Sequence, residues 1–276
     1  MKKFCITIPV YTKELSIIDK IGLKKIYEIT GNKKYDVYFI CPKSLDLTNY
    51  KNIYYNALEC RFDDKWFVSL YSYTQLCMQY EFYDRFSKYE YMFMYQLDSY
   101  IWEDRIEEIC NLGYDYIGGP IFSKLANWNL VDNNGNYCPK VGNGGCGWRK
   151  ISTFKDICNP NGEFRKFYNI TDDYLKDISF EDKYFSNDIE YIYDLNKPSW
   201  EEALLYVWDS SVPEIWDYFG NDKIHPICAH GIYRYFNYWY GKIPEYTNLE
   251  VAEYSFNKVK NMLNVYENTE NESKQM

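Results

Sequence analysis

Short apolar runs alternate with helical periodicity along the N-terminal part of the chain. The apolar run at residues 4–8 predicts a buried strand that ends at Pro9, and residues 15–29 repeat apolar side chains at helical spacing as far as Gly31. Further strands are expected at residues 35–41, 53–58, 91–95 and 114–118. This alternation is typical of an α/β protein with a mostly parallel sheet.

The longer helical patterns complete this outline. Residues 91–95 form a continuous apolar run, which predicts a central strand buried on both faces. Helices are expected at residues 66–86, 103–112, 151–158, 164–168, from 181 onward, and 199–208, where Ser199 and Glu202 form a capping box. Residues 123–140 are polar and predict a flexible insertion. We expect one domain over residues 1–246, then over residues 247–276 a C-terminal helix and a polar tail that is disordered from residue 267.

The net charge of the chain narrows the classes of molecule that we expect it to bind. The net charge of −9 excludes nucleic acid as the expected partner, because phosphate recognition normally requires an excess of basic side chains. An acidic protein can still bind an anionic nucleotide when a divalent cation lies between them. The 32 tyrosines are typical of codon bias, although some rings could stack on a sugar or a base.

The distribution of cysteines and apolar residues along the chain indicates the cellular compartment in which the protein is expected. The nine cysteines contain no C-x-x-C pair, and scattered single thiols favour a reducing environment. The apolar run at the N-terminus is too short for a signal peptide, and no apolar run approaches the roughly 20 residues that span a bilayer. We therefore expect a cytoplasmic protein without a transmembrane segment, with the inner face of the membrane as a further location. Peripheral membrane association and homo-oligomer formation stay open.

Two segments could surround a ligand. Asp98 follows the apolar run 91–95, and carboxylates beyond the carboxyl edge of a parallel strand face the crevice where α/β sheets bind ligands. Alternatively, Asp98 only caps the next turn. Residues 142–147 contain four glycines, which permit close backbone approach, but they match neither the dinucleotide nor the P-loop spacing. They form either one wall of a ligand pocket or simply a tight loop.

Two further segments carry titratable side chains. Glu181 and Asp182 open a predicted helix, where the helix dipole alone favours acidic residues and where a carboxylate could also act as a general base. His225 and His230 are the only histidines of the chain, and Gly231 follows the second one. Histidine is a common metal ligand, but a single histidine is also often structural.

In this order, the segments resemble the GT-A class of nucleotide-sugar glycosyltransferases, and within it a domain-of-unknown-function family of bacterial and viral glycosyltransferase-like proteins. The resemblance spans residues 4–235. Its motifs lie at residues 95–100, 115–120, 141–145, 181–186 and 229–231. It implies a GT-A (Rossmann-like) fold with a mixed, mostly parallel central sheet flanked by helices, and a single GT-A-like catalytic domain over residues 1–246.

The resemblance also implies roles for individual residues. Asp98 and His230 would hold Mn²⁺ or Mg²⁺, and Gln96 stands where the Asp-x-Asp motif of the class has its first carboxylate. Gln96 would then contact the ribose or a metal-bound water. Asp182 would be the catalytic base, with Glu181 as the second candidate. The residues implied for the nucleotide-sugar donor are Pro9, Val10, Tyr11, Gln96, Gly144 and Gly145.

The function implied is a metal-dependent transfer of a sugar from a nucleotide-sugar donor, expected to be UDP-linked, to a glycan or a lipid-linked glycan. A single base opposite the leaving group predicts inversion at the anomeric carbon. Two alternatives stay open: a non-catalytic carbohydrate-binding protein, and a sugar-phosphate nucleotidyltransferase. The second is less favoured because no glycine-rich basic segment follows Pro9.

Overall fold

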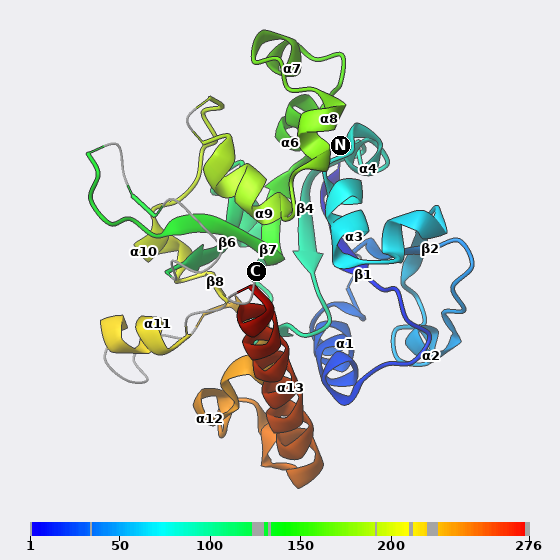
Figure 1. Ribbon diagram of the computed structural model, residues 1–276. Helices are drawn as coiled ribbons and strands as arrows, with labels where there is room; N and C mark the ends of the chain where they lie inside the picture. Colours follow the sequence, from blue (N-terminus) through cyan, green and yellow to red (C-terminus); the bar gives the residue numbers. More distant parts are fainter. Residues whose placement is uncertain are drawn as a thin grey trace.

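The computed structural model describes residues 2–33, 35–122, 130–131, 134–190, 192–209, 212–219 and 226–273. Its centre is a six-stranded sheet in the order β3-β2-β1-β4-β7-β6 (Figure 1). The strands are β1 (Lys2–Pro9), β2 (Val37–Pro42), β3 (Leu58–Phe62), β4 (Tyr89–Tyr95), β6 (Tyr116–Ile121) and β7 (Lys140–Lys150). Neighbours from β3 to β4 pair in parallel, whereas β7 is antiparallel to both β4 and β6. The sheet is therefore mixed and mostly parallel, as predicted.

Helices cover both faces of this sheet. The helices of the N-terminal part are α1 (Ile17–Thr30), α2 (Thr48–Lys51), η1 (Asp64–Phe67), α3 (Leu70–Cys77), α4 (Tyr80–Asp84) and α5 (Ile106–Cys110). Those that follow β7 are α6 (Ile151–Cys158), α7 (Glu163–Phe167), α8 (Asp172–Lys176), α9 (Glu181–Lys183), the π-helix η3 (Tyr184–Asp188), α10 (Trp200–Ala203) and α11 (Val212–Phe219). The C-terminal ones are η4 (Ile232–Tyr235), α12 (Phe236–Trp239), η5 (Pro244–Thr247) and α13 (Leu249–Ser273).

Alternate side chains of the central strands enter two separate cores. Ile6 and Phe93 pack with Leu23 of α1 on one side, whereas Cys5 and Met92 pack with the α3, α4 and α6 side chains on the other. Because successive residues of a strand point to opposite faces, an unbroken apolar strand such as β4 requires helices on both sides. The continuous apolar run at residues 91–95 predicts this arrangement correctly.

A second, three-stranded sheet lies beside the first. It consists of β5 (Tyr100–Ile101), β9 (Cys228–Ala229) and β8 (Val207–Trp208), in the order β5-β9-β8. Antiparallel pairing of Tyr100 with Ala229 and parallel pairing of Trp208 with Ala229 bring three distant parts of the chain together. The residues that follow β4, β8 and β9 are thereby held side by side.

Several sequence-based boundaries are wrong. The third strand runs over Leu58–Phe62 instead of residues 53–58, because Tyr54 and Ala57 are buried in the turns after α2. The helix expected over residues 66–86 is divided into η1, α3 and α4, and the extended backbone of Gln79 separates the last two.

Two C-terminal predictions also differ from the structure. The helix beginning at Ser199 ends at Ala203, and Glu202 accepts hydrogen bonds from the Tyr114 and Tyr206 hydroxyls instead of completing a capping box. Residues 267–273, for which the composition predicts disorder, continue α13. Of the insertion predicted at residues 123–140, residues 123–129 and 132–133 lie outside the described residues.

One pair of cysteines is bonded, although the sequence predicts scattered single thiols. Cys146 of β7 and Cys228 of β9 form a disulfide across 82 positions of the chain. A disulfide is unusual in a reducing compartment and does not support the expected cytoplasmic location. Among the described residues, none of the helices combines the length and the apolar character required to cross a bilayer.

The backbone that follows β4 packs closely against α1. A Cβ atom added to Gly22 would collide with the carbonyl oxygen of Leu97 and crowd that of Ser99. We expect Gly22→Ala to lower the free energy of unfolding by about 1–3 kcal/mol, because neither backbone can move without disturbing the sheet. Chemical denaturation measures this loss. Lys24→Ala, an exposed change on the same helix, is the control, and equal stability of the two variants would contradict the close approach.

Candidate active site

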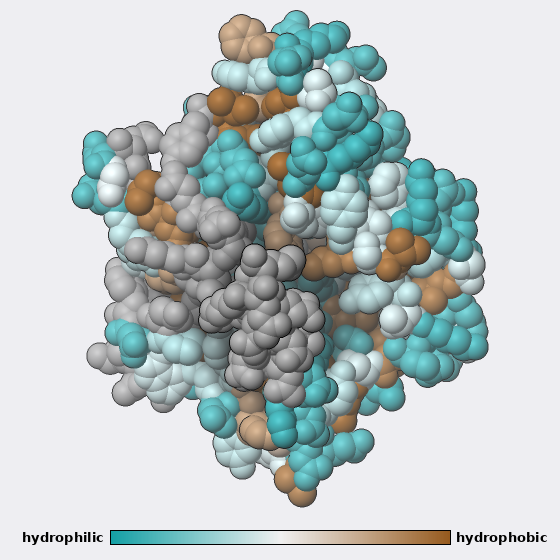
Figure 2. All heavy atoms as spheres, viewed as in Figure 1, coloured by the Kyte–Doolittle hydropathy of each residue, from teal (hydrophilic) through white to brown (hydrophobic). Residues whose placement is uncertain are grey.

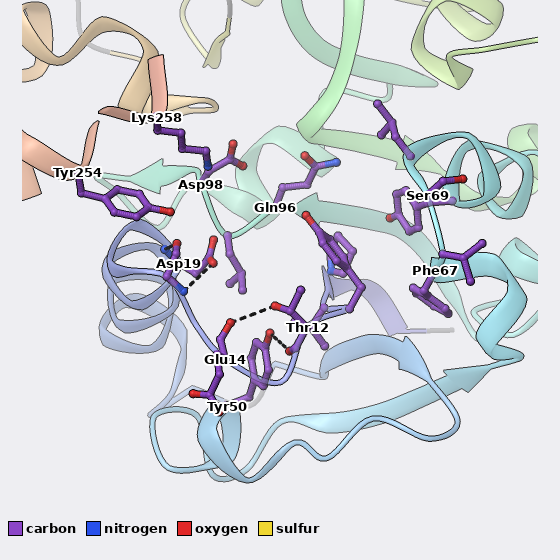
Figure 3. Close-up of a pocket in the computed structure, with 18 residues that line it drawn as sticks. Thr12, Glu14, Asp19, Tyr50, Phe67, Ser69, Gln96, Asp98, Tyr254 and Lys258 are labelled. Atoms are coloured by element: carbon purple, nitrogen blue, oxygen red, sulfur yellow. Dashed lines mark hydrogen bonds between the residues drawn. The ribbon is translucent and has the colours of Figure 1, made fainter. Parts of the chain in front are cut away.

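A cavity of about 670 Å³ opens beyond the carboxyl ends of β1 and β4 (Figure 3). Its wall includes five residues singled out from the sequence: Pro9, Val10, Tyr11, Gln96 and Asp98. Parallel sheets bind ligands at this edge, and the volume is in the range of small-molecule sites. Apolar side chains of Val68 and Leu70, 77% and 64% exposed, lie on the rim, and Figure 2 shows apolar side chains at the surface near α3.

Backbone hydrogen bonds fix the segment that carries Asp98. The Gln96 amide donates to the Gly145 carbonyl at 2.8 Å, and the Ser99 amide donates to the Gln96 carbonyl at 3.0 Å. The buried Tyr95 hydroxyl donates to the Ser99 carbonyl at 2.8 Å, and the Ile232 amide donates to the Asp98 carbonyl at 3.1 Å. Asp98 therefore occupies a defined position, with Gln96 beside it in the cavity (Figure 3).

His230 lies between two carboxylates. Its Nε2 is 3.1 Å from Asp98 Oδ1, and its Nδ1 is 2.7 Å from Asp209 Oδ2. Asp209 in turn has Oδ1 3.5 Å from Nη1 of Arg234. The structure thus brings Asp98 and His230 together as predicted, and it adds Asp209. His225 lies outside the described residues.

The two carboxylates determine the protonation of this cluster. Burial alone would lower the pKa of His230, but Asp98 and Asp209 raise it to about 10. Burial would likewise raise the pKa of Asp98, but His230, Lys258 and Arg234 hold it well below its usual range. Both carboxylates therefore favour the protonated form of the His230 imidazole.

The cluster has the chemistry of a small divalent-cation site. Asp98 Oδ1 and His230 Nε2 lie 3.1 Å apart, and Asp209 contacts the other nitrogen of the imidazole, as carboxylates do for metal-binding histidines. Among the residues that the structure describes, no group of three His, Cys, Asp or Glu side chains could hold an ion. Two protein ligands are nevertheless sufficient for Mg²⁺ or Mn²⁺ when phosphate oxygens and water complete the coordination. The residues present therefore fit an ion that binds together with a nucleotide.

Two adjacent glycines allow this cluster to approach the acidic pair. A Cβ atom added to Gly145 would overlap the His230 ring, and one added to Gly144 would overlap the Asp182 carboxylate. The glycine-rich segment belongs to β7 and is not a separate loop. Gly144 and Gly145 therefore form a thin wall with His230 packed against one residue and Asp182 against the next.

Glu181 and Asp182 differ in accessibility. Glu181 is 6% exposed; its Oε2 accepts a hydrogen bond from the Thr74 hydroxyl at 3.0 Å, and its Oε1 lies 3.5 Å from Nη2 of Arg149. The Asp182 side chain is 23% exposed and lies 3.8 Å from the same guanidinium nitrogen. Burial and the charge of Glu181 raise the pKa of Asp182 well above its ordinary value, although Arg149 opposes them. Of the two carboxylates, Asp182 is the more exposed, and neither belongs to the lining of the cavity.

Four contributors to the site were missed in the sequence: Arg149, Asp209, Tyr254 and Lys258. Asp209 directly follows β8, so the rule that identifies Asp98 also applies to it, but the sequence pattern predicts a helix over residues 199–208. Arg149 is fully buried, and its Nη1 donates to the Tyr83 hydroxyl at 2.9 Å. Tyr254 and Lys258 come from α13, and no sequence pattern connects that helix with the cavity.

Solved structures with the same architecture include two glycosyltransferases. Mouse xyloside xylosyltransferase 1 aligns with a TM-score of 0.54 and 8% identity over 83% of this chain and 97% of that chain. The bifunctional glycosyltransferase WbbM aligns with a TM-score of 0.50 and 11% identity over 91% of this chain, which spans 51% of that one. The protein therefore has a glycosyltransferase fold of the GT-A type.

The chain belongs to the family described as proteins of unknown function, DUF5672, whose model matches residues 58–230. The sequence has no significant match among curated proteins. The matched residues include β4, the glycine-rich strand β7, the acidic pair and His230.

The buried ion cluster generates a stability prediction. Arg149→Met would leave Glu181 buried without its cation, so we expect a loss of about 3–5 kcal/mol in the free energy of unfolding. In the double variant Arg149→Met/Glu181→Gln, the uncompensated charge is absent, and stability should be partly regained. Urea denaturation of wild type, both single variants and the double variant measures the coupling. Strictly additive losses would show that the pair is not coupled.

Proposed function

We propose that this protein is a metal-dependent glycosyltransferase that moves a sugar from a nucleotide-sugar donor, expected to be UDP-linked, to a glycan or a lipid-linked glycan. The observation that carries the proposal is the contact between Asp98 Oδ1 and His230 Nε2, 3.1 Å apart beside a cavity at the carboxyl edge of the sheet. The glycosyltransferase fold supports the same class of reaction.

The cavity wall suggests how a donor lies. Pro9, Val10 and Tyr11 form its wall at the end of β1, where the nucleoside would pack. Gln96 would contact the ribose or a water, and the diphosphate would extend toward Asp98 and His230. The sugar would then face the Gly144–Gly145 wall. This order places the anomeric carbon between the metal ligands and Asp182.

A divalent cation held by Asp98 and His230 would supply Lewis-acid stabilisation to the leaving diphosphate. The protein's own groups then account for the remaining chemistry. Asp209 keeps the His230 ring oriented, and Asp182 accepts the proton of the acceptor hydroxyl. The new bond joins that oxygen to the anomeric carbon as the bond to the phosphate oxygen breaks, and the electron pair leaves with the nucleoside diphosphate.

Asp182 is suited to this role by its surroundings. Its raised pKa makes it a stronger base than an ordinary carboxylate, which favours proton transfer from a hydroxyl. Because one base opposite the leaving group supports a single in-line displacement, we propose that the reaction inverts the anomeric configuration.

Titrations with a nucleoside diphosphate test whether Asp98 and His230 are metal ligands. We expect the wild type to bind a nucleoside diphosphate tightly with Mn²⁺ and weakly with EDTA, because the cation bridges the phosphates to Asp98 and His230. Asp98→Ala and His230→Ala should abolish the Mn²⁺-dependent part of binding in calorimetric titrations. Asp173→Ala changes an exposed carboxylate on α8 and is the control. Unchanged Mn²⁺-dependent binding in both site variants would rule out this metal site.

The base is tested by kinetics and stereochemistry. Asp182→Asn should lower kcat by a factor of about 10²–10⁴ while the dissociation constant of the donor stays close to that of the wild type. Asp177→Asn, an exposed change in the preceding turn, should leave kcat unchanged. NMR of the product should show inversion, and a retained configuration would exclude the single displacement. A protein that binds donor without ever releasing free nucleoside diphosphate would instead be a carbohydrate-binding protein.

A further inference from the structure

The C-terminal helix α13 forms part of the cavity wall. Tyr254 and Lys258 are four positions apart, so they lie on one face of this helix, and both line the cavity (Figure 3). Val251 and Ser255, 4% and 0% exposed, anchor the same helix in the protein interior. The position of Lys258 is therefore set by buried packing.

Lys258 carries a positive charge beside Asp98. Among the described residues, its ammonium group forms no ion pair, and its Nζ lies 3.8 Å from the centroid of the Tyr233 ring. Figure 3 shows the side chain extending toward Asp98. Its charge is one of those that hold the pKa of Asp98 low. An ammonium group on an aromatic face, beside a candidate metal ligand in the cavity wall, is placed to bind an anion that enters the cavity.

We propose that Lys258 binds the diphosphate of the nucleotide-sugar donor, so that α13 is an integral part of the donor site. The inference rests on the proposed function. It adds a binding residue and an element that lie beyond residues 58–230, the part matched by the family model. The ligand class is a nucleoside diphosphate, because a phosphate group is the anion that the cavity would bring to Asp98 and His230.

The charges of the cavity favour this assignment. The chain carries a net charge of −9, and Glu14, Asp19 and Asp98 all line the cavity. One divalent cation balances the charge of two phosphates but not that of the carboxylates in the cavity wall, so a further positive charge favours binding. Gln96 stands at the position where a second carboxylate could bind the cation more tightly. Lys258 supplies a positive charge at that edge of the cavity.

Lys258 can act in both binding and leaving-group departure. Its ammonium group would donate hydrogen bonds to phosphate oxygens. As the bond between the anomeric carbon and the phosphate oxygen breaks, the negative charge on the diphosphate increases, and the attraction to Lys258 increases with it. The Tyr233 ring restricts the side chain, which lowers the entropy lost when the phosphate binds.

The test is a titration of the full chain with nucleoside diphosphates in the presence of Mn²⁺. UDP, GDP, CDP and ADP are titrated into the wild type by calorimetry, and the tightest ligand is used for the variants. Lys258→Gln should weaken its binding by about 10- to 100-fold, because one charge-assisted hydrogen bond to phosphate is lost. Lys258→Arg should recover most of the affinity, since it keeps the charge.

Lys260→Gln is the matched control, because this lysine lies two positions further along α13 and is exposed. Its affinity should equal that of the wild type, and the melting temperatures of all three variants should stay close together. Equal affinity of wild type and Lys258→Gln would overturn the inference while leaving the proposed function intact. A wild type that binds none of the four nucleoside diphosphates would overturn both.

Discussion

The pairing of β4 with the antiparallel strand β7 is the constraint on which the site depends. It extends past the end of β4 through the bond from the Gln96 amide to the Gly145 carbonyl. That bond places the segment carrying Asp98 directly against the two glycines. Because those glycines have no side chains, His230 and Asp182 can approach the same short stretch of backbone. The candidate metal ligands and the candidate base are thus arranged by one strand pair.

Charge is distributed unequally around that strand pair. The cluster of Asp98, His230 and Asp209 lies next to the cavity, whereas Arg149 and Glu181 are sealed within the core. A buried ion pair contributes little net stability compared with apolar packing, but it holds its partners in one place. Arg149 fixes Glu181, and Asp182, the next residue, is left at the surface of the same cluster. The buried pair of Arg149 and Glu181 therefore positions the carboxylate of Asp182, which itself stays partly exposed.

The sequence predicts most strands of the central sheet, with β3 displaced, and several residues of the candidate site, because those features are local. β4 is recognisable from its apolar run, and Asp98 from its place after it. The order of the glycine-rich segment, Asp182 and His230 then favours a glycosyltransferase fold, which the solved structures confirm. Their roles in catalysis stay predictions.

The features that escaped prediction depend on contacts between distant segments. In the sequence, Arg149 is only a basic residue that follows a glycine-rich segment. The fold shows that its side chain is fully buried. Asp209 is positioned by β8. This strand has only two residues, which is too short to produce a recognisable hydrophobic pattern in the sequence. The boundary at Gln79 arises because tertiary packing overrides a favourable helical pattern. The place of Lys258 in the cavity wall could not be predicted, because it depends on where α13 packs.

The bond between Cys146 and Cys228 closes a loop that contains both Asp182 and Asp209. A cross-link of this kind removes conformations from the unfolded chain, and in the chain-entropy model the effect increases with loop length. It also means that the residues beside Gly145 and the residues before His230 cannot separate when the surrounding strands fluctuate. Local opening of this region would therefore involve both walls of the site at once, and the half with the base and the half with the metal ligands would behave as one cooperative unit.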